Sequence, residues 1–409
     1  MTQNRLVAPL AAAFLVAAGP AFADIVKIGL LAPLTGPSAA DGEEFVRGVT
    51  WAVEEANAKG GVAGHTFEVV TADVNDHSAA NVSSAVERLL GEDGVEVILT
   101  GYASLSMFEV EMMMEAGMLY LSAGPSPSFA AIVSPAPEDY WCCWSYTASF
   151  KGYETDVRPA VESLAARGEF TLRDKTVAII SSDNAYSKTI SEGMKVSFSE
   201  GGWSVVVDEL VPFGEVGDWR PILARVRETN PDLIVNTDYL PGNSALFLNQ
   251  FLEAPTNSLV FLQYAPSVPE FVKLTGENST GVLYNLINAP LNSPGWPRGE
   301  ALMRAYEERF GLESGAYGVG LYEMASLYFS ALETVGDPTK REEISAVIGA
   351  TKAETAAGIL EFDPATHVAL QSNDRIPVSF WQIQDGKRVL IEPAAFANGA
   401  FLLPPWMSK

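Results

Sequence analysis

The chain has 409 residues, of which 51 are Asp or Glu and 26 are Lys or Arg, so its formal net charge at pH 7 is −25. A chain this acidic offers no broad basic surface to the phosphates of DNA or RNA, and we expect no nucleic-acid partner. Hydrophobic residues make up 48% and aromatic residues 10%, which excludes a disordered chain and, at this length, fits two globular domains.

The first 23 residues have the pattern of a secretory signal peptide. Arg5 precedes an apolar stretch at residues 6–18, Pro20 ends it, and residues 21–23 (AFA) match the small-x-small pattern of a cleavage site. The stretch is too short to span a bilayer comfortably, and no later apolar run is long enough. We therefore predict cleavage after Ala23 and a soluble product in the periplasm, without membrane insertion.

From residue 24 onward, short apolar runs alternate with amphipathic stretches. Residues 25–31 predict a strand buried on both faces, and residues 43–59 predict a helix that ends at Gly60 and Gly61. The next predicted elements are strands at 66–73, 95–101 and 118–124 and helices at 79–90 and 104–116. This alternation is typical of a parallel sheet with helices on both faces.

A segment with prolines at positions 125, 127, 135 and 137 interrupts the alternation, which then starts again. The second series has predicted strands at 176–183, 203–210, 232–239, 259–265 and 281–285 and predicted helices at 185–200, 218–229 and 242–253. Further predicted helices at 298–310, 316–335 and 340–348 precede antiparallel strands at 358–362, 377–384 and 388–392 and an extended tail at 401–406. Two such series predict two α/β lobes.

The sequence lacks the motifs that would indicate an enzyme or a cofactor. It contains no phosphate-binding GxxxxGK motif, no zinc-binding HExxH motif and no nucleophile elbow. The histidines at positions 65, 77 and 367 have no metal-ligand spacing, and the adjacent Cys142 and Cys143 predict two reduced, packed thiols. We expect a binding protein with no catalytic residue, no metal and no cofactor.

Several motifs occur in a characteristic order. The chain after the leader opens with KIGLLAPLTGP at residues 27–37, and EEANAKGGVAG follows at residues 54–64. Later pieces are the strand at 232–239, Gly281-Val282 and Gly315-Ala316-Tyr317. Together these motifs resemble the leucine/isoleucine/valine-type periplasmic binding proteins, the type I solute-binding components of ABC importers. The resemblance covers nearly the whole chain after residue 23.

The resemblance implies an α/β fold of the periplasmic binding protein type I class, with two Rossmann-like lobes joined by three crossover segments. We place the crossovers near residues 146–150, 286–290 and 355–360. Lobe I then comprises residues 24–147 and 288–356, and lobe II comprises residues 148–287 and 357–409. Family members bind a small polar ligand in the cleft, close by a hinge and deliver it to a membrane permease; we expect a monomer.

The carboxyl ends of parallel strands are where ligands collect in α/β sheets. The predicted strand at 95–101 is followed by Tyr102 and by Ser104, which is expected to begin a helix whose free N–H groups attract an anion. The alternative is that Ser104 is only an N-cap. The resemblance further implies that the Gly124 carbonyl and the Ser126 hydroxyl contact the polar head of the ligand.

Tyrosines follow two predicted strands of the second lobe. The resemblance places Tyr186 and Tyr239 at positions that contact ligand, and Tyr317 near the pocket for the ligand's side chain. A tyrosine supplies apolar area and one hydroxyl, which suits a ligand with both characters. Packing in the core is the alternative role for each of them.

The chain departs from the family where an ammonium group would bind. Family members that bind α-amino acids present a carboxylate at the position of Tyr264. A buried ammonium group without an anion is unfavourable, so either another acid replaces it or the ligand has no ammonium group. Asp41 and Asp238 are the candidate replacements; the alternatives are a helix N-cap for Asp41 and solvent contact for Asp238.

These observations leave three classes of function. We expect an extracytoplasmic solute-binding protein of an ABC importer that captures an amino acid or close analogue by hinge closure. The alternatives are the same fold binding a neutral amide, a urea-like compound or a small aromatic carboxylate, or acting as a sensor lobe for a membrane receptor. A secreted α/β enzyme is disfavoured, because no nucleophile–base pair is evident.

Overall fold

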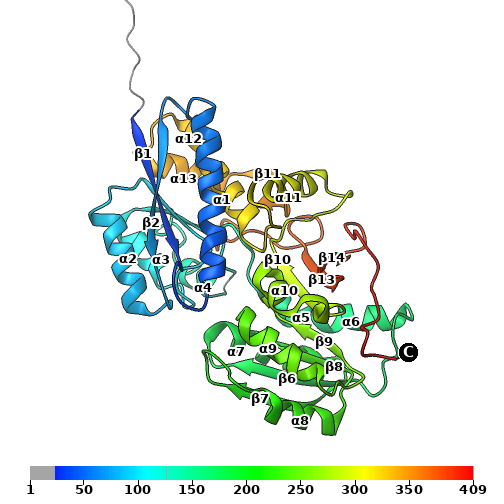
Figure 1. Cartoon of the computed structure of the whole chain (residues 1–409). Helices are drawn as coiled ribbons and strands as arrows, with labels where there is room; N and C mark the ends of the chain where they lie inside the picture. Colours follow the sequence, from blue (N-terminus) through cyan, green and yellow to red (C-terminus); the bar gives the residue numbers. More distant parts are fainter. Residues whose placement is uncertain (1–23, 126, 409) are drawn as a thin grey trace, which may run out of the picture.

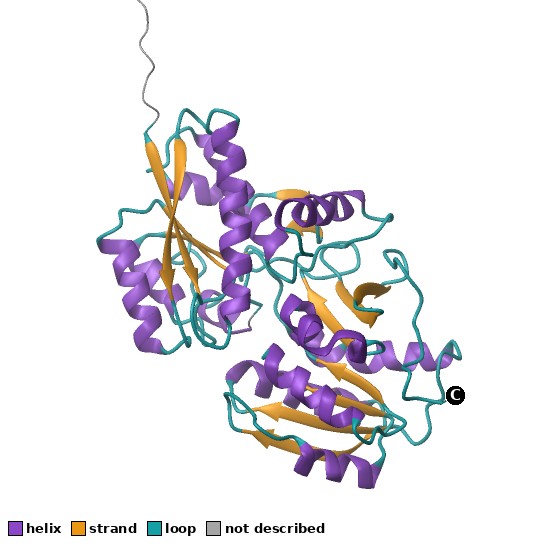
Figure 2. Cartoon of the chain, viewed as in Figure 1, coloured by secondary structure: helices purple, strands orange, loops and turns teal. Residues whose placement is uncertain are grey.

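A computed structural model describes residues 24–125 and 127–408, which form two α/β lobes (Figure 1). The predicted signal peptide and Ser126 lie outside the described residues. Each lobe has a sheet covered by helices, and the strands of the lower lobe lie side by side with helices packed against them (Figure 2). The fold predicted from the sequence is confirmed.

The N-terminal lobe contains a parallel sheet of five strands. These are β1 (Ile25–Ala32), β2 (Thr66–Asp73), β3 (Val97–Thr100), β4 (Leu119–Ser122) and β5 (Cys143–Ser145), in the order β2-β1-β3-β4-β5. Helices α1 (Ala39–Ala58), α12 (Gly318–Val335) and α13 (Arg341–Gly349) cover one face, and α2 (Ala79–Gly91), α3 (Glu109–Ala116) and α4 (Pro127–Val133) cover the other. Because side chains alternate along a strand, Leu30 and Leu31 enter separate cores.

The C-terminal lobe contains a sheet of seven strands. Five are parallel: β6 (Thr176–Ser182), β7 (Ser204–Val211), β8 (Leu233–Asn236), β9 (Leu259–Leu262) and β10 (Leu283–Ile287). The antiparallel strands β13 (Val378–Gln384) and β14 (Lys387–Glu392) complete the order β14-β13-β10-β9-β8-β6-β7. Helices α5 (Lys151–Thr155), α6 (Val157–Ala166) and α7 (Ala185–Glu200) cover one face, and α8 (Arg220–Thr229), α9 (Pro241–Leu252) and α10 (Pro269–Thr275) cover the other.

The chain passes between the lobes through segments near those predicted. The first joins β5 to α5, and the second joins β10 to α11 (Pro297–Phe310). A small sheet of β11 (Lys352–Thr355) and β12 (Gly358–Glu361) follows α13. After it, Val368 pairs with Ser145 of β5, and the His367 ring stacks on Trp144 with centroids 4.1 Å apart. These contacts place residues 367 and 368 against the N-terminal sheet, while the lobe boundaries, including the crossover at 355–360, stay a prediction.

Several elements were not expected from the sequence: α4, β5, α5, α6, α10 and β11. Pro127, predicted to interrupt regular structure, is the first residue of α4, where a proline needs no backbone N–H. The aromatic stretch before the first crossover supplies β5, which extends the N-terminal sheet. Cys142 and Cys143 are free and buried there, as predicted. The tail is also confirmed, since Phe401 and Leu403 pack against the core of the C-terminal lobe.

Candidate ligand-binding site

A pocket lies between the two sheets, at the carboxyl ends of strands from both lobes. It contains about 780 Å³ of space not filled by protein atoms, including its opening to solvent. The lining residues come from loops after the strands, from the first two crossovers, and from the starts of α7 and α12. They are Tyr102, Ser104, Leu105, Met107, Ala123, Gly124, Pro125, Thr147, Phe150, Tyr153, Tyr186, Tyr239, Tyr264, Ile287, Asn288, Ala316, Tyr317, Gly320 and Leu321.

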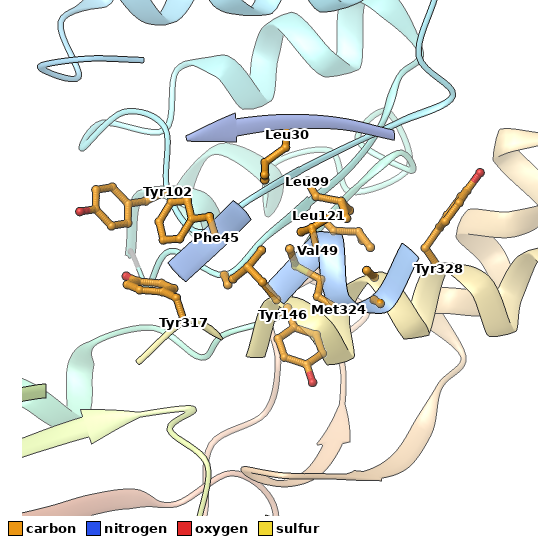
Figure 3. Packing of buried hydrophobic residues seen from close by; sticks show 14 of the residues in the cluster. Leu30, Phe45, Val49, Leu99, Tyr102, Leu121, Tyr146, Tyr317, Met324 and Tyr328 are labelled. Carbon is orange, nitrogen blue, oxygen red and sulfur yellow. The ribbon is translucent and has the colours of Figure 1, made fainter. Parts of the chain in front are cut away.

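Aromatic side chains dominate this lining. It includes six tyrosines, among them all five that the sequence singled out, and Phe150. The rings pack against one another: the centroids of Tyr102 and Tyr317 are 5.6 Å apart, as are those of Tyr186 and Tyr239. Tyr102 and Tyr317 also flank Phe45 at one end of the N-terminal core (Figure 3). The core thus holds two of the pocket's rings in place.

Asp41 is buried behind these rings and is bonded to both lobes. Its Oδ2 accepts a hydrogen bond of 2.6 Å from the Tyr102 hydroxyl, and its Oδ1 accepts one of 2.7 Å from the Tyr264 hydroxyl. Tyr264 follows β9, so the second bond crosses the cleft. Burial raises the pKa of Asp41 to about 7, against the opposing effect of the two hydroxyls. Asp41 lies in the first turn of α1, whose N-cap is Ser38.

Ser104 lines the pocket, but it does not begin a helix as predicted. Met107 has a φ of +62°, which a right-handed helix cannot include, and α3 starts only at Glu109. The Ser104 hydroxyl donates a 2.5 Å hydrogen bond to the buried Glu109 carboxylate, which also accepts one from the Tyr120 hydroxyl. Burial raises the pKa of Glu109. The N-cap and helix-dipole roles expected for Ser104 are therefore wrong.

Two other predicted residues lie differently with respect to the pocket. Gly124 lines it, and an added Cβ there would approach the Met107 and Tyr102 side chains to 2.9 and 3.0 Å. Asp238 is buried outside the lining, where its carboxylate accepts hydrogen bonds from the Leu240 N–H and the Asn243 amide. Burial raises the pKa of Asp238 to about 6. Asp238 thus holds the start of α9 rather than meeting solvent.

Asn288 is a lining residue that the sequence analysis did not identify. Its Nδ2 donates to the Tyr146 carbonyl at 3.3 Å and to Thr147 Oγ1 at 3.0 Å. Its Oδ1 is buried and has no hydrogen-bond partner in the described part of the protein. The predicted crossovers 146–150 and 286–290 contain three lining residues, Thr147, Phe150 and Asn288. The crossover prediction could therefore have indicated that these residues lie at the pocket.

The described residues contain no cluster of three His, Cys, Asp or Glu side chains that could hold a metal ion. Across residues 24–125 and 127–408, no helix has the length and apolar character needed to cross a bilayer.

A comparison with protein-family models identifies the fold. Residues 25–387 match the model described as "Periplasmic binding protein". The chain belongs to this family. Members of the family bind solutes, and this periplasmic binding protein is accordingly not an enzyme.

Relatives of this periplasmic binding protein match 90–98% of its length. It is 26% identical to the Leu/Ile/Val-binding protein homolog 7 of Brucella abortus (strain 2308), over 98% of this chain and 100% of the relative. A Silicibacter pomeroyi protein, provisionally described as a branched-chain amino acid ABC transporter, is 32% identical with a TM-score of 0.83, covering 94% and 100% of the two chains. A leucine binding protein from Thermotoga maritima MSB8 is 21% identical with a TM-score of 0.74, covering 90% and 97%.

Proposed function

We propose that this chain is the extracytoplasmic solute-binding protein of an ABC importer and that its lobes close on one small molecule. The observation that carries this proposal is a single pocket wall built from the strand ends of both lobes. Opening the lobes would separate Tyr102 from Tyr264 and expose the pocket. Hinge closure of this kind converts ligand binding into a shape that a permease distinguishes.

Two observations point to different ligands. The Brucella and Silicibacter relatives carry names that refer to branched-chain amino acids, which agrees with the amino acid expected from the sequence. The lining as described contains no Asp, Glu, Lys, Arg or His, whereas an amino acid carries both a positive and a negative charge. Burying those charges without partners is costly. The chemistry of the pocket therefore favours the alternative ligands, neutral amides and related compounds.

A ligand screen tests the proposed function. Purified protein is unfolded and refolded to remove bound ligand, and its melting temperature is measured with amino acids, amides, urea-like compounds and carboxylates. A ligand present at 100 times its Kd stabilises the folded state by about 2.7 kcal/mol, which raises the melting temperature measurably. Binding of at least one of these solutes supports the proposal. The absence of stabilisation by all classes, or chemical conversion of a bound compound, contradicts it.

The partner and the location form part of the same proposal. We infer that the leader directs the chain to the periplasm and is cleaved after Ala23. Mass spectrometry of the secreted protein should then find Asp24 as its first residue. The ligand-bound protein is expected to stimulate ATP hydrolysis by its reconstituted permease. Stimulation of a receptor kinase instead would assign the chain to the sensor class.

A further inference from the structure

We propose that the pocket selects uncharged ligands that combine an apolar body with one N–H or O–H donor, and that it discriminates against α-amino acids. This inference rests on the proposed function and deepens it by naming the class of solute. It follows from three observations. Hydrogen bonds already engage the carboxylates behind the lining, and no lining side chain is positively charged. One buried acceptor oxygen, Asn288 Oδ1, has no partner among the described residues.

The Asp41 carboxylate does not line the pocket and is engaged by two tyrosine hydroxyls. Both oxygens of Asp41 already accept short hydrogen bonds, from Tyr102 and from Tyr264. All three side chains are buried, with Asp41 only 5% exposed. An ammonium group that displaced either tyrosine would leave a buried hydroxyl without its acceptor, which costs about 1–3 kcal/mol. The lining itself therefore offers an amino group no anion, and Asp41 becomes its partner only by displacing Tyr102 or Tyr264.

The surroundings also disfavour an anionic ligand. Asp41 and Glu109 lie directly behind the lining, since each is hydrogen-bonded to residues that face the pocket. His77 packs behind Tyr102, with ring centroids 5.0 Å apart, and its burial lowers its pKa and favours the neutral form. No side chain of the described lining carries a positive charge. A ligand carboxylate would thus be buried near two acids with no cation to pair it.

Asn288 supplies one polar group for recognition, beside the Tyr239 hydroxyl, which also has no hydrogen-bond partner among the described residues. Only an NH₂ group can donate to the Tyr146 carbonyl, so this bond fixes which way the Asn288 amide is turned. Its Oδ1 is then an acceptor, buried at a residue only 5% exposed that lines the pocket, and it has no partner among the described residues. A primary amide, an alcohol or a phenol supplies the missing donor without introducing a charge. The aromatic rings suit the apolar body of such a ligand.

Matched probes on one carbon skeleton test this selection. Isothermal titration calorimetry of the ligand-stripped protein compares 4-methylpentanamide, 4-methylpentanoate and L-leucine, and separately 3-phenylpropanamide, 3-phenylpropanoate and L-phenylalanine. We expect an amide to bind at least tenfold more tightly than the carboxylate and the amino acid of its series. An amino acid or a carboxylate that binds best in its series overturns the inference, but leaves solute capture standing. Failure of every solute in the broad screen contradicts the proposed function instead.

A variant at Asn288 tests the acceptor. In the wild-type protein, 3-phenylpropanamide should bind about tenfold more tightly than methyl 3-phenylpropanoate, which has no hydrogen-bond donor. Asn288→Ala should erase this preference, whereas a merely structural effect would weaken both probes equally and overturn the role of Asn288. Asn278→Ala, an exposed asparagine outside the pocket lining, is the control and should keep the preference. Circular dichroism of both variants checks that they fold.

Discussion

We expect Asp41 to make closure of the cleft depend on pH. In the described conformation its carboxyl group is buried and its pKa is raised to about 7, from an ordinary value of 3.8. If opening lets water reach Asp41, the open form has the lower pKa, and the closed form binds more protons between these two values. Closure therefore gains stability from protonation of Asp41 at low pH and loses this contribution as the pH rises through 7.

Ligand affinity should accordingly fall about tenfold between pH 6 and pH 8 and level off above. The measurement is calorimetric titration with a solute from the screen that does not itself ionise in this range. In Asp41→Asn the group that titrates is gone, and we expect nearly constant affinity. Asp238→Asn is the matched control, because Asp238 is also buried with a raised pKa, but its carboxylate bonds only to Leu240 and Asn243 of its own lobe. A wild-type pH dependence in Asp41→Asn would contradict this role.

The sequence identified five of the six tyrosines of the pocket and Ser104, but not Thr147 or Asn288. Tyr102, Tyr239 and Tyr264 follow buried strands, and the carboxyl ends of parallel strands meet at one edge, so their convergence could be predicted. The hydrogen bond to the Tyr146 carbonyl, 142 residues away in sequence, orients the Asn288 amide, and its Oδ1 then has no partner among the described residues. The pairing of Ser104 with Glu109 likewise depends on the left-handed backbone of the intervening loop. Such contacts are set by tertiary structure, and no local pattern reports them.

At the scale of elements, the start of α12 forms part of the pocket wall. Gly320 is buried and lines the pocket, yet a Cβ added there would have no atom within 4 Å. Its missing side chain therefore leaves open space. Since glycine is also about 0.5–1 kcal/mol less favourable in a helix than most residues, a larger residue here should not weaken α12.

Gly320→Leu should fill the pocket and reduce ligand affinity at least a hundredfold. The urea midpoint of unfolding should stay the same or rise, because an added Cβ meets no atom within 4 Å and leucine is a better helix former than glycine. Gly242→Leu in α9 is the control: this glycine is exposed, outside the pocket lining, and likewise has no atom within 4 Å of an added Cβ. It should keep wild-type affinity. Unchanged affinity in Gly320→Leu would show that the ligand does not occupy this pocket.

The predicted order of elements is largely that of the structure, because hydrophobic periodicity marks strands and helices that are buried on both sides of a sheet. The strand at 66–73 and the helix at 185–200 have the predicted bounds. Hydrophobic periodicity does not predict a short strand whose formation depends on pairing at the edge of a sheet. Strand β5 has three residues and exists because it pairs with β4, and residues 362–369 stay with the N-terminal lobe through Trp144.

At the scale of the whole molecule, contacts join the start of α1 to the C-terminal lobe, and we expect them to favour a closed cleft. The Tyr264 hydroxyl bonds to Asp41 across the cleft, and Ser38 and Asp41 share a small cavity with Tyr239 and Leu240. The described conformation therefore combines a closed cleft with contacts that need no ligand atom. Removing one such contact should shift the balance toward the open form.

Tyr264→Phe removes the hydroxyl that bonds to Asp41 and keeps the ring in the pocket wall. Loss of one hydrogen bond worth about 1 kcal/mol favours the open form about fivefold. We expect a larger radius of gyration by small-angle X-ray scattering without ligand, recovery of the wild-type value at saturating ligand, and a Kd raised about fivefold. Tyr322→Phe loses a 3.0 Å bond to Glu55 within one lobe and should change neither quantity. Equal scattering from both ligand-free variants would mean that the Tyr264 bond does not control closure.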